Sequence, residues 1–316
     1  MTRFVVSIFS VGLMVVGTGA VSSQDYPNKP LRIVTTPVGG GSDLLSRLIA
    51  QGISGPLGQS VIVDNRPTAV IAEIVAKAPA DGYTLLATSP GLWVLPLFEK
   101  TRYDPVRDFS PISLTARAPL LLVVHPSLPV KSVKELIDLA KAKPGVLNYA
   151  AGSIGTPPHL AGELFKVMAG VNIVYVPYKS TGPAVIGLLS GQAEMMIDTG
   201  PSQVPHIKSG KLRALAVTTA KPSALFPDLP TLAATVPGYE MENTNVMFAP
   251  AKTPAAIITR LNQEIARVLN RPEVKQRFSD VGTETVGSSP EQLAATVKSD
   301  MVKWRKLIKD AGLRRE

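Results

Sequence analysis

Short runs of Val, Ile and Leu alternate along this chain with longer segments in which apolar residues recur every three or four positions. The short runs predict buried strands, and the longer segments predict amphipathic helices. In the first 90 residues the expected order is strand, helix, strand, helix, strand, at 33–36, 44–56, 61–63, 69–78 and 83–87. This order is typical of a parallel sheet with helices on both faces.

The same pattern returns in the second part of the chain. After a loop rich in Pro and Asp at 103–112, we expect strands at 120–124, 147–150, 173–176, 195–197 and 212–218. Ser132 and Glu135 predict a capping box, and Pro183 fits the first position of a helix over 184–190. A further helix is expected over 159–168. A strand at 245–249 and helices at 254–269, 272–278 and 290–311 follow, and we expect these three helices to brace both halves.

The segment Ile33–Arg47 reads as a strand, a glycine loop and the start of a helix. Ser42 or Asp43 is expected at the N-cap. Main-chain N–H groups and the positive end of the helix dipole favour an anion there, although a tight turn into a capped helix explains the pattern equally well. Leu44 stands where a dinucleotide fingerprint needs glycine. The candidate contacts are Thr36, Pro37, Val38, Gly39, Gly40, Gly41 and Asp43.

Other loops that follow predicted strands carry small polar residues. Right-handed crossovers place such loops at one edge of a sheet, so Thr88–Gly91 should lie beside Pro37–Asp43. A second glycine loop precedes the helix that contains His159. Helix capping, a solvated lysine and a structural histidine are the plain alternatives to ligand contact. The further candidates are Ser89, Ser153, Gly155, Thr156, His159, Lys179, Thr181, Gly182 and Asp198.

An enzyme and a metal protein are less well supported. Residues 151–155 miss the G-x-S-x-G nucleophile elbow by one residue, because Ala151 stands in place of glycine. Ser153, His159 and Asp198 come in the wrong chain order for that fold, and His159 follows too closely to reach the hydroxyl easily. The chain has no Cys and no pair of His at ligand spacing, so we expect neither a metal nor a cofactor.

The N-terminal sequence and the overall composition indicate where the protein acts and what it binds. Arg3, an apolar run to about Val16 and the small residues that follow are typical of a signal peptide over residues 1–23. The formal charge of +9 is scattered, and aromatic residues make up only 5 % of the chain. We therefore expect no nucleic-acid partner. A diffuse positive surface would instead raise the association rate of small anions.

An ordered set of short runs resembles the Bug family, the exported solute-binding receptors of tripartite tricarboxylate transporters. Each run is weak alone, but together they cover nearly all of the chain after the signal peptide. Departures are Val38, where a second proline is usual, and a loop after Pro67 that is about three residues short. The matching runs are Tyr26–Arg32, Pro37–Gly40 with Asp43, Asn65–Pro67, Asp81–Leu86, His159–Glu163, Val176–Lys179, Gly210–Ala216 and Trp304.

This resemblance implies a two-lobed Venus-flytrap fold of the type II-like periplasmic class, each lobe a mixed sheet flanked by helices. It implies a periplasmic monomer that closes over a dicarboxylate, an acidic amino acid or an aromatic acid, and that serves the membrane subunits of a transporter. A receptor for a membrane sensor is the alternative. We expect one lobe to comprise 24–117 with 246–285, and the other 118–245 with 286–316.

Overall fold

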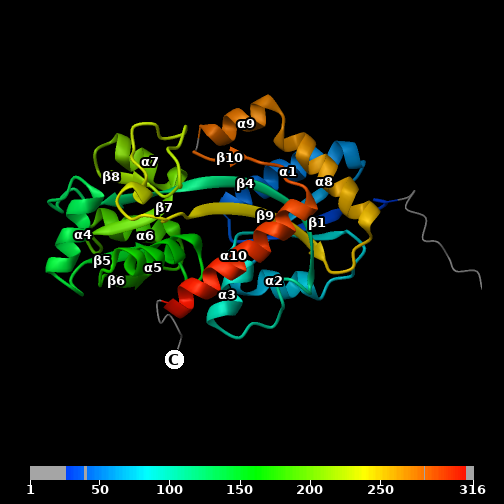
Figure 1. The fold of residues 1–316 in the computed structure, drawn as a ribbon. Coiled ribbons are helices and arrows are strands. Elements are labelled where there is room, and N and C mark those ends of the chain that lie inside the picture. Colours follow the sequence, from blue (N-terminus) through cyan, green and yellow to red (C-terminus); the bar gives the residue numbers. More distant parts are fainter. Residues whose placement is uncertain (1–25, 39–40, 281, 311–316) are drawn as a thin grey trace, which may run out of the picture.

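The computed structural model describes residues 26–38, 41–280 and 282–310. These residues form two lobes, each a sheet covered by helices (Figure 1). Strand β4 (Phe109–Val124) runs through both lobes and pairs with β9 (Glu242–Pro250) along most of its length. The predicted two-lobed α/β fold is confirmed. The predicted signal peptide lies outside the described residues.

The first lobe has the predicted alternation of strands and helices. Its parallel strands lie in the order β2-β1-β3, and β9 continues the sheet beside β3 in the antiparallel direction. This arrangement puts the loops after β1 and β3 at the same edge, because parallel strands have the same polarity. The elements are β1 (Leu31–Thr35), α1 (Gly41–Leu57), β2 (Val61–Asn65), α2 (Thr68–Ala76), β3 (Thr84–Thr88) and α3 (Gly91–Phe98).

The second lobe repeats this plan with one antiparallel strand at its centre. Parallel strands lie in the order β7-β5-β6, and β4 pairs antiparallel with both β7 and β8. The predicted capping box is only half formed. The backbone N–H of Glu135 donates to Ser132 Oγ at 3.2 Å, but Glu135 Oε2 accepts from the backbone N–H of Lys131, at 2.6 Å, and not from that of Ser132. The elements are α4 (Val133–Ala142), β5 (Asn148–Ala151), α5 (Pro157–Ala169), β6 (Val174–Pro177), α6 (Thr181–Leu189), β7 (Met195–Thr199), α7 (Gly200–Lys208) and β8 (Arg213–Val217).

Proline misled the sequence analysis in the middle of the chain. The predicted loop over 103–112 and the predicted strand over 120–124 are partly one strand, β4. Pro111 is accommodated because the pairing with β9 shifts register just after it, and Pro119 pairs with the first residue of β9. Helices α3 and α7 were not predicted, and both contain internal proline, at Pro96 and Pro205.

Two predicted helix starts are also wrong. Helix α1 begins at Gly41, so Ser42 and Asp43 lie inside its first turn and neither is the N-cap. Ser42 Oγ instead donates to Asn245 Oδ1 of β9 at 2.7 Å. Helix α6 begins at Thr181, which puts Pro183 at its third position and leaves the first two amide N–H groups of the helix intact.

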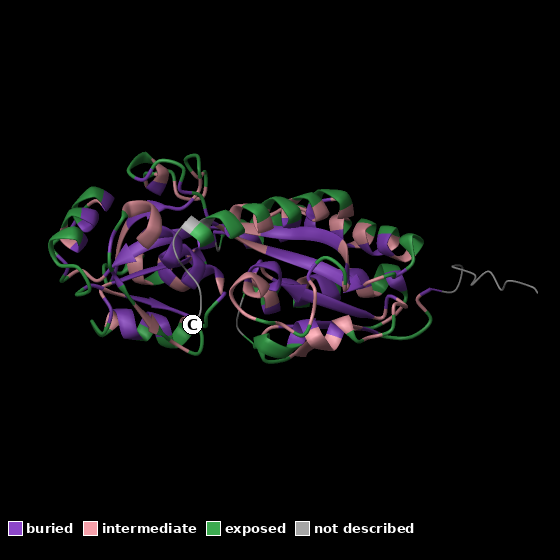
Figure 2. Cartoon of the chain, turned by 60° about the horizontal axis from the view of Figure 1, so that its bottom comes forward, coloured by how far each residue is buried: buried purple, intermediate pink, exposed green. Residues whose placement is uncertain are grey.

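The C-terminal elements pack on the first lobe and on β4, the strand that runs through both lobes. Helix α8 (Ala255–Leu269) packs on α1, and α9 (Pro272–Ser279) leads to the short strand β10 (Glu284–Thr285), which pairs with β4. Helix α10 (Pro290–Asp310) crosses in front of β9 and packs on β4 and α3, where Trp304 is buried (Figure 1). The sheets are buried and the outer helix faces are exposed (Figure 2).

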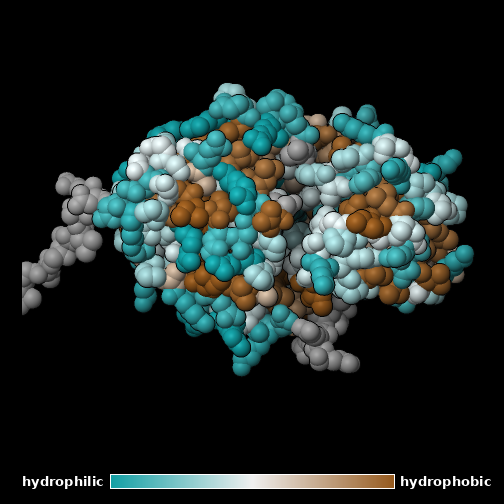
Figure 3. Space-filling view, turned by 180° about the vertical axis from the view of Figure 1, so that it is seen from behind, coloured by the Kyte–Doolittle hydropathy of each residue, from teal (hydrophilic) through white to brown (hydrophobic). Residues whose placement is uncertain are grey.

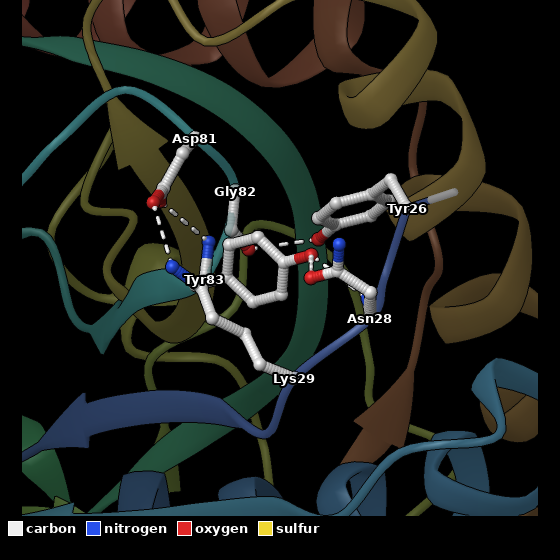
Figure 4. A network of polar contacts seen from close by, with 6 residues as sticks. All are labelled: Tyr26, Asn28, Lys29, Asp81, Gly82 and Tyr83. Carbon is white, nitrogen blue, oxygen red and sulfur yellow. Dashed lines mark hydrogen bonds and ion pairs between the residues drawn. The ribbon is translucent and has the colours of Figure 1, made fainter. Parts of the chain in front are cut away.

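The lead-in before β1 is tied to the turn before β3 (Figure 4). The hydroxyl of Tyr26 donates to the carbonyl of Gly82 at 2.8 Å, and Tyr83 and Asn28 hydrogen-bond at 2.9 Å. Lys29 Nζ lies 3.4 Å from Asp81 and 4.3 Å from the centre of the Tyr83 ring. These contacts anchor the described N-terminus on the side of the lobe away from the loop edge. None of the described helices is long and apolar enough to cross a membrane.

Candidate functional site

A cleft between the lobes contains a cavity of about 410 Å³. From behind, a furrow separates the two lobes (Figure 3). The first lobe contributes the residues after β1, the start of α1 and two further loops, the second lobe contributes the loops after β5, β6 and β7, and β9 contributes one side chain. The lining residues are Thr36, Pro37, Val38, Gly41, Ser42, Thr68, Ser89, Gly152, Ser153, Thr156, Pro157, Pro158, Lys179, Ser180, Thr181, Gly182, Asp198, Thr199 and Asn243.

Most of the predicted contact residues come together in this cleft. The loops after β1 and β3 lie side by side as expected, because Pro37 and Ser89 line the same cavity. Gly39 and Gly40 lie outside the described residues. The predicted residues that line the cavity are Thr36, Pro37, Val38, Gly41, Ser89, Ser153, Thr156, Lys179, Thr181, Gly182 and Asp198.

Three predicted contacts do not line the cavity and support its walls instead. The carboxylate of Asp43 is buried, pairs with Arg47 Nε at 2.9 Å and accepts a hydrogen bond from Asn65 Nδ2 at 2.9 Å. His159 Nδ1 accepts a long hydrogen bond, 3.4 Å, from the backbone N–H of Gly155. Gly155 itself has φ +82°, a conformation that favours glycine. These contacts shape the loops beside the cavity.

The second glycine loop rests on aromatic side chains. The hydroxyl of Tyr175 donates to the carbonyl of Gly152, and its ring lies 4.7 Å from the ring of His159 and 5.3 Å from that of Tyr149. Burial lowers the pKa of His159, so the imidazole is neutral at neutral pH and can accept from Gly155. The loop is thus held from below at both of its glycines.

Five helices begin at the cleft, namely α1, α2, α5, α6 and α7. The N-caps of the last three are Thr156, Ser180 and Thr199, and none of these side chains caps its own helix. The first N–H groups of a helix have no partner within the helix, and the helix dipole makes this end positive. The cleft is therefore suited to an anion, although among the described residues Lys179 is the one cationic side chain that lines it.

Asp198 is the buried charge of the cleft. The residue lies next to the last position of β7 and is 2 % exposed. Oδ1 accepts a hydrogen bond from the backbone N–H of Thr199 at 2.6 Å. Burial raises the pKa of the carboxyl to about 6, while its contacts with Thr199 and Thr181 act in the opposite direction. A negative charge thus lies among helix ends that favour anions.

The sequence analysis missed several lining residues. Ser180, Thr199, Pro157 and Pro158 flank residues that were predicted, so their proximity along the chain was a usable signal. Thr68 is the first residue of α2, one residue before the predicted start of that helix. Asn243 had no such signal, because its position depends on the register of β9 against β4.

A second, larger cavity of about 670 Å³ lies beside the central strands. Its charged side chains are of both signs and come from β4, β9, β10, α9 and the segment between β8 and β9. Acidic and basic groups are equal in number there, so their charges offset each other. Its charged residues are Arg117, Lys221, Lys275, Glu240, Glu242 and Glu284.

The geometry does not favour the hydrolase alternative. The hydrogen bonds that position His159 and Asp198 run to Gly155 and Thr199, not to each other or to Ser153. Serine nucleophiles need a base within hydrogen-bond reach that is itself oriented by an acid. Among the described residues, no group of three or more His, Asp or Glu is placed to hold a metal ion.

Comparison with known proteins gives consistent results. A family model described as "Tripartite tricarboxylate transporter family receptor" matches residues 45–313. Protein BugT of Bordetella pertussis (strain Tohama I) is 34 % identical over 321 residues, which cover 99 % of this chain and 98 % of BugT.

Two solved structures with ligands share the fold. "R. palustris Rpa4515 with adipate" has a TM-score of 0.85 and 39 % identity, and the match covers 91 % of this chain and 99 % of that one. MatC from Rhodopseudomonas palustris, with bound malate, has a TM-score of 0.81 and 29 % identity, covering 90 % of this chain and 100 % of MatC. Both bound molecules are dicarboxylates.

Proposed function

Because this chain belongs to the tripartite tricarboxylate transporter receptor family, the Bug family, we propose that it is an exported receptor that binds a small carboxylate for a membrane transporter. The family consists of periplasmic solute-binding receptors and is not a family of enzymes. The carboxylate as ligand is supported by the adipate and the malate in the two similar structures. On this proposal the protein is a monomer in the periplasm.

The convergence of helix starts from both lobes on one cavity carries this proposal. Helix α1 brings its positive end from the first lobe, and α5, α6 and α7 bring theirs from the second. A carboxylate held there receives N–H donors without a fixed arginine, which suits a receptor that must also release its ligand. Lys179 adds attraction at long range from its exposed position.

Closure of the two lobes is the proposed mechanism of capture. We assign residues 24–117 with 246–285 to one lobe and 118–245 with 286–316 to the other, with β4 and β9 as the linking strands. Binding in the micromolar range corresponds to about 8 kcal/mol of net free energy. Part of the gross contact energy is used to order the two lobes around the ligand.

A ligand screen tests the proposal. The protein, purified from a periplasmic extract, is heated with mono-, di- and tricarboxylates, acidic amino acids and aromatic acids, and hits are measured by calorimetry. Ligands that bind only the folded state raise the melting midpoint by mass action. We expect a shift with one chemical subset of the acids, and a matched set of alcohols and amides without a carboxylate serves as the control.

The outcomes separate the possibilities. A folded protein that responds to no acid contradicts carboxylate capture. A response to acids with no loss of uptake when the receptor is deleted from the cell favours the sensor alternative. Uptake that depends on both this chain and a membrane transporter supports the transport role.

A further inference from the structure

Two of the described residues that line the cleft have a buried side-chain oxygen without a hydrogen-bond partner, Asp198 at Oδ2 and Asn243 at Oδ1, and only that of Asp198 belongs to an ionisable group. Oδ2 of Asp198 is buried and has no hydrogen bond among the described residues, whereas Oδ1 is held by the backbone N–H of Thr199. Buried polar atoms in folded proteins nearly always have a partner, and an exception calls for an explanation. Because Asp198 lines the ligand cavity, a group on the ligand is the natural partner.

The surroundings of Asp198 leave its charge poorly compensated. On α7, the amide oxygen of Gln203 accepts from the backbone N–H of Asp198 at 3.2 Å in its hydrogen-bonded orientation, so it does not contact the carboxylate. On α6, Thr181 offers only a hydroxyl. Lys179 lines the same cavity but is exposed. Near neutral pH, a ligand with nothing but carboxylates would add negative charge beside a carboxylate that is mostly ionised.

We propose that the ligand carries a hydroxyl or ammonium group on the carbon next to a carboxylate, and that this group donates a hydrogen bond to Asp198 Oδ2. The inference rests on the proposed function and narrows it, from carboxylates in general to 2-hydroxy and 2-amino acids. It makes Asp198 the residue that distinguishes these ligands from plain dicarboxylates.

The position of Asp198 explains why the donor lies next to a carboxylate. Oδ1 is fixed to the backbone N–H of Thr199, the N-cap of α7, so Oδ2 lies close to the start of that helix. Thr181 places the start of α6 on the same carboxyl group. A ligand carboxylate that faces these two helix ends therefore brings its neighbouring carbon within reach of Oδ2.

Matched acids test this inference. Calorimetry at pH 7.5 compares succinate with malate and aspartate, glutarate with 2-hydroxyglutarate and glutamate, and adipate with 2-hydroxyadipate. We expect the donor-bearing acid of the preferred chain length to bind about 10- to 100-fold more tightly, as for a hydrogen bond to a charged group. In Asp198→Asn the preference should fall to about threefold or less.

Asp300→Asn is the control variant. Burial raises the pKa of Asp300 as well, but this residue lies on α10 beside Trp93, outside the cleft. It undergoes the same change of charge and should keep the preference of the parent protein. Any loss of preference in Asp300→Asn would show that net charge, rather than Oδ2, causes the effect.

The possible failures are distinct. Equal binding of plain and donor-bearing acids by the parent protein overturns the inference and leaves carboxylate capture in place. A preference that survives in Asp198→Asn also overturns it. Binding of no acid by folded protein refutes the proposed function itself. The comparison in the parent protein remains decisive even if the variant does not fold.

Discussion

The two sides of the cleft wall in the second lobe have the same local plan and different chemistry. On the α5 side, the loop after β5 leads into Pro157 and Pro158, which have no N–H to offer. On the α6–α7 side, Thr181 and Gly182 keep their amides, and Asp198 lies between the two helix starts. The α5 side therefore presents hydroxyls, whereas the α6–α7 side presents amides and a buried carboxylate.

The supports of the two sides differ in the same sense. The loop of the α5 side rests on neutral side chains, Tyr175 and His159, whose hydrogen bonds run to its glycines. The α6–α7 side is organised around a charge, because Asp198 bonds to Thr199 and neighbours Thr181. The strand–loop–helix pattern thus determines where each side of the cleft lies. The residues at the start of the helix determine which charged groups that side favours.

The largest expected effect concerns the stability cost of Asp198. Burial raises the pKa of this carboxyl from its ordinary value of 3.8 to about 6 in the folded state. The folded protein thus holds a proton that the unfolded chain has lost, so stability falls as the pH rises from about 4 through about 6. This pKa difference corresponds to a loss of at most about 3 kcal/mol of folding free energy. Chemical denaturation of the parent and of Asp198→Asn at pH 4 and pH 8 measures this loss.

Asp198→Asn removes this cost and keeps an acceptor for the backbone N–H of Thr199. We expect the variant to be more stable than the parent at pH 8, with a difference that shrinks towards pH 4. A difference that does not change with pH would mean that Asp198 is not desolvated in the folded protein.

Loss of one amide on the α6 side should weaken carboxylate binding about 10- to 100-fold. Thr181→Pro removes the N–H at the first helical position, where proline is tolerated. Ser180 before it is already extended, with ψ 174°, as a residue before proline requires. Thr181→Ala, which keeps the amide and removes only the hydroxyl, is the control. Calorimetry with the strongest acid of the screen gives the two affinities, and equal losses would assign the effect to the hydroxyl.

The sequence predicted those parts of the fold that depend on local pattern. The strands and helices of both lobes have the expected order, because apolar period reflects burial directly. The continuous strand β4 and helices α3 and α7 were not predicted because they contain proline, at Pro111 and Pro119 in β4, at Pro96 in α3 and at Pro205 in α7. Pro111 lies at a register shift, and Pro119 pairs with the first residue of β9. Pro96 and Pro205 lie in short helices of 8 and 9 residues. None of these features can be read from the local sequence pattern.

The cleft was predictable as an edge and less so as a set of side chains. Loops after parallel strands of one sheet lie at the same edge, which brought Pro37 and Ser89 together, while Ser153 joins them from the facing lobe. The direction in which each side chain points was not predictable in this way. Asp43 and His159 turn inward to support loops, and Asn243 reaches the cavity from β9, about 200 residues after the first loop. Such positions follow from tertiary packing, which one sequence does not reveal.

A smaller effect is expected from the supports of the α5 side. Tyr175→Phe removes the hydroxyl that donates to the carbonyl of Gly152. One neutral hydrogen bond contributes about 0.5–1.5 kcal/mol, so we expect binding to weaken by about 2- to 12-fold as the loop loosens. Tyr178→Phe is the matched control, since its hydroxyl donates to Gln192 in an exposed pair of residues that flank α6. If both variants bind alike, the loop does not depend on this support.

The smallest effect is expected where an amide is restored. Pro157→Ala gives α5 an N–H at its first helical position and so makes the α5 side resemble the α6 side. Proline is preorganised there, so its loss should lower the free energy of unfolding by less than about 1 kcal/mol. Because the hydroxyls of Ser153 and Thr156 already serve this side, we expect calorimetry to give an affinity within about threefold of the parent. A gain approaching the loss in Thr181→Pro would instead show that the two sides bind in the same way and differ only by two prolines.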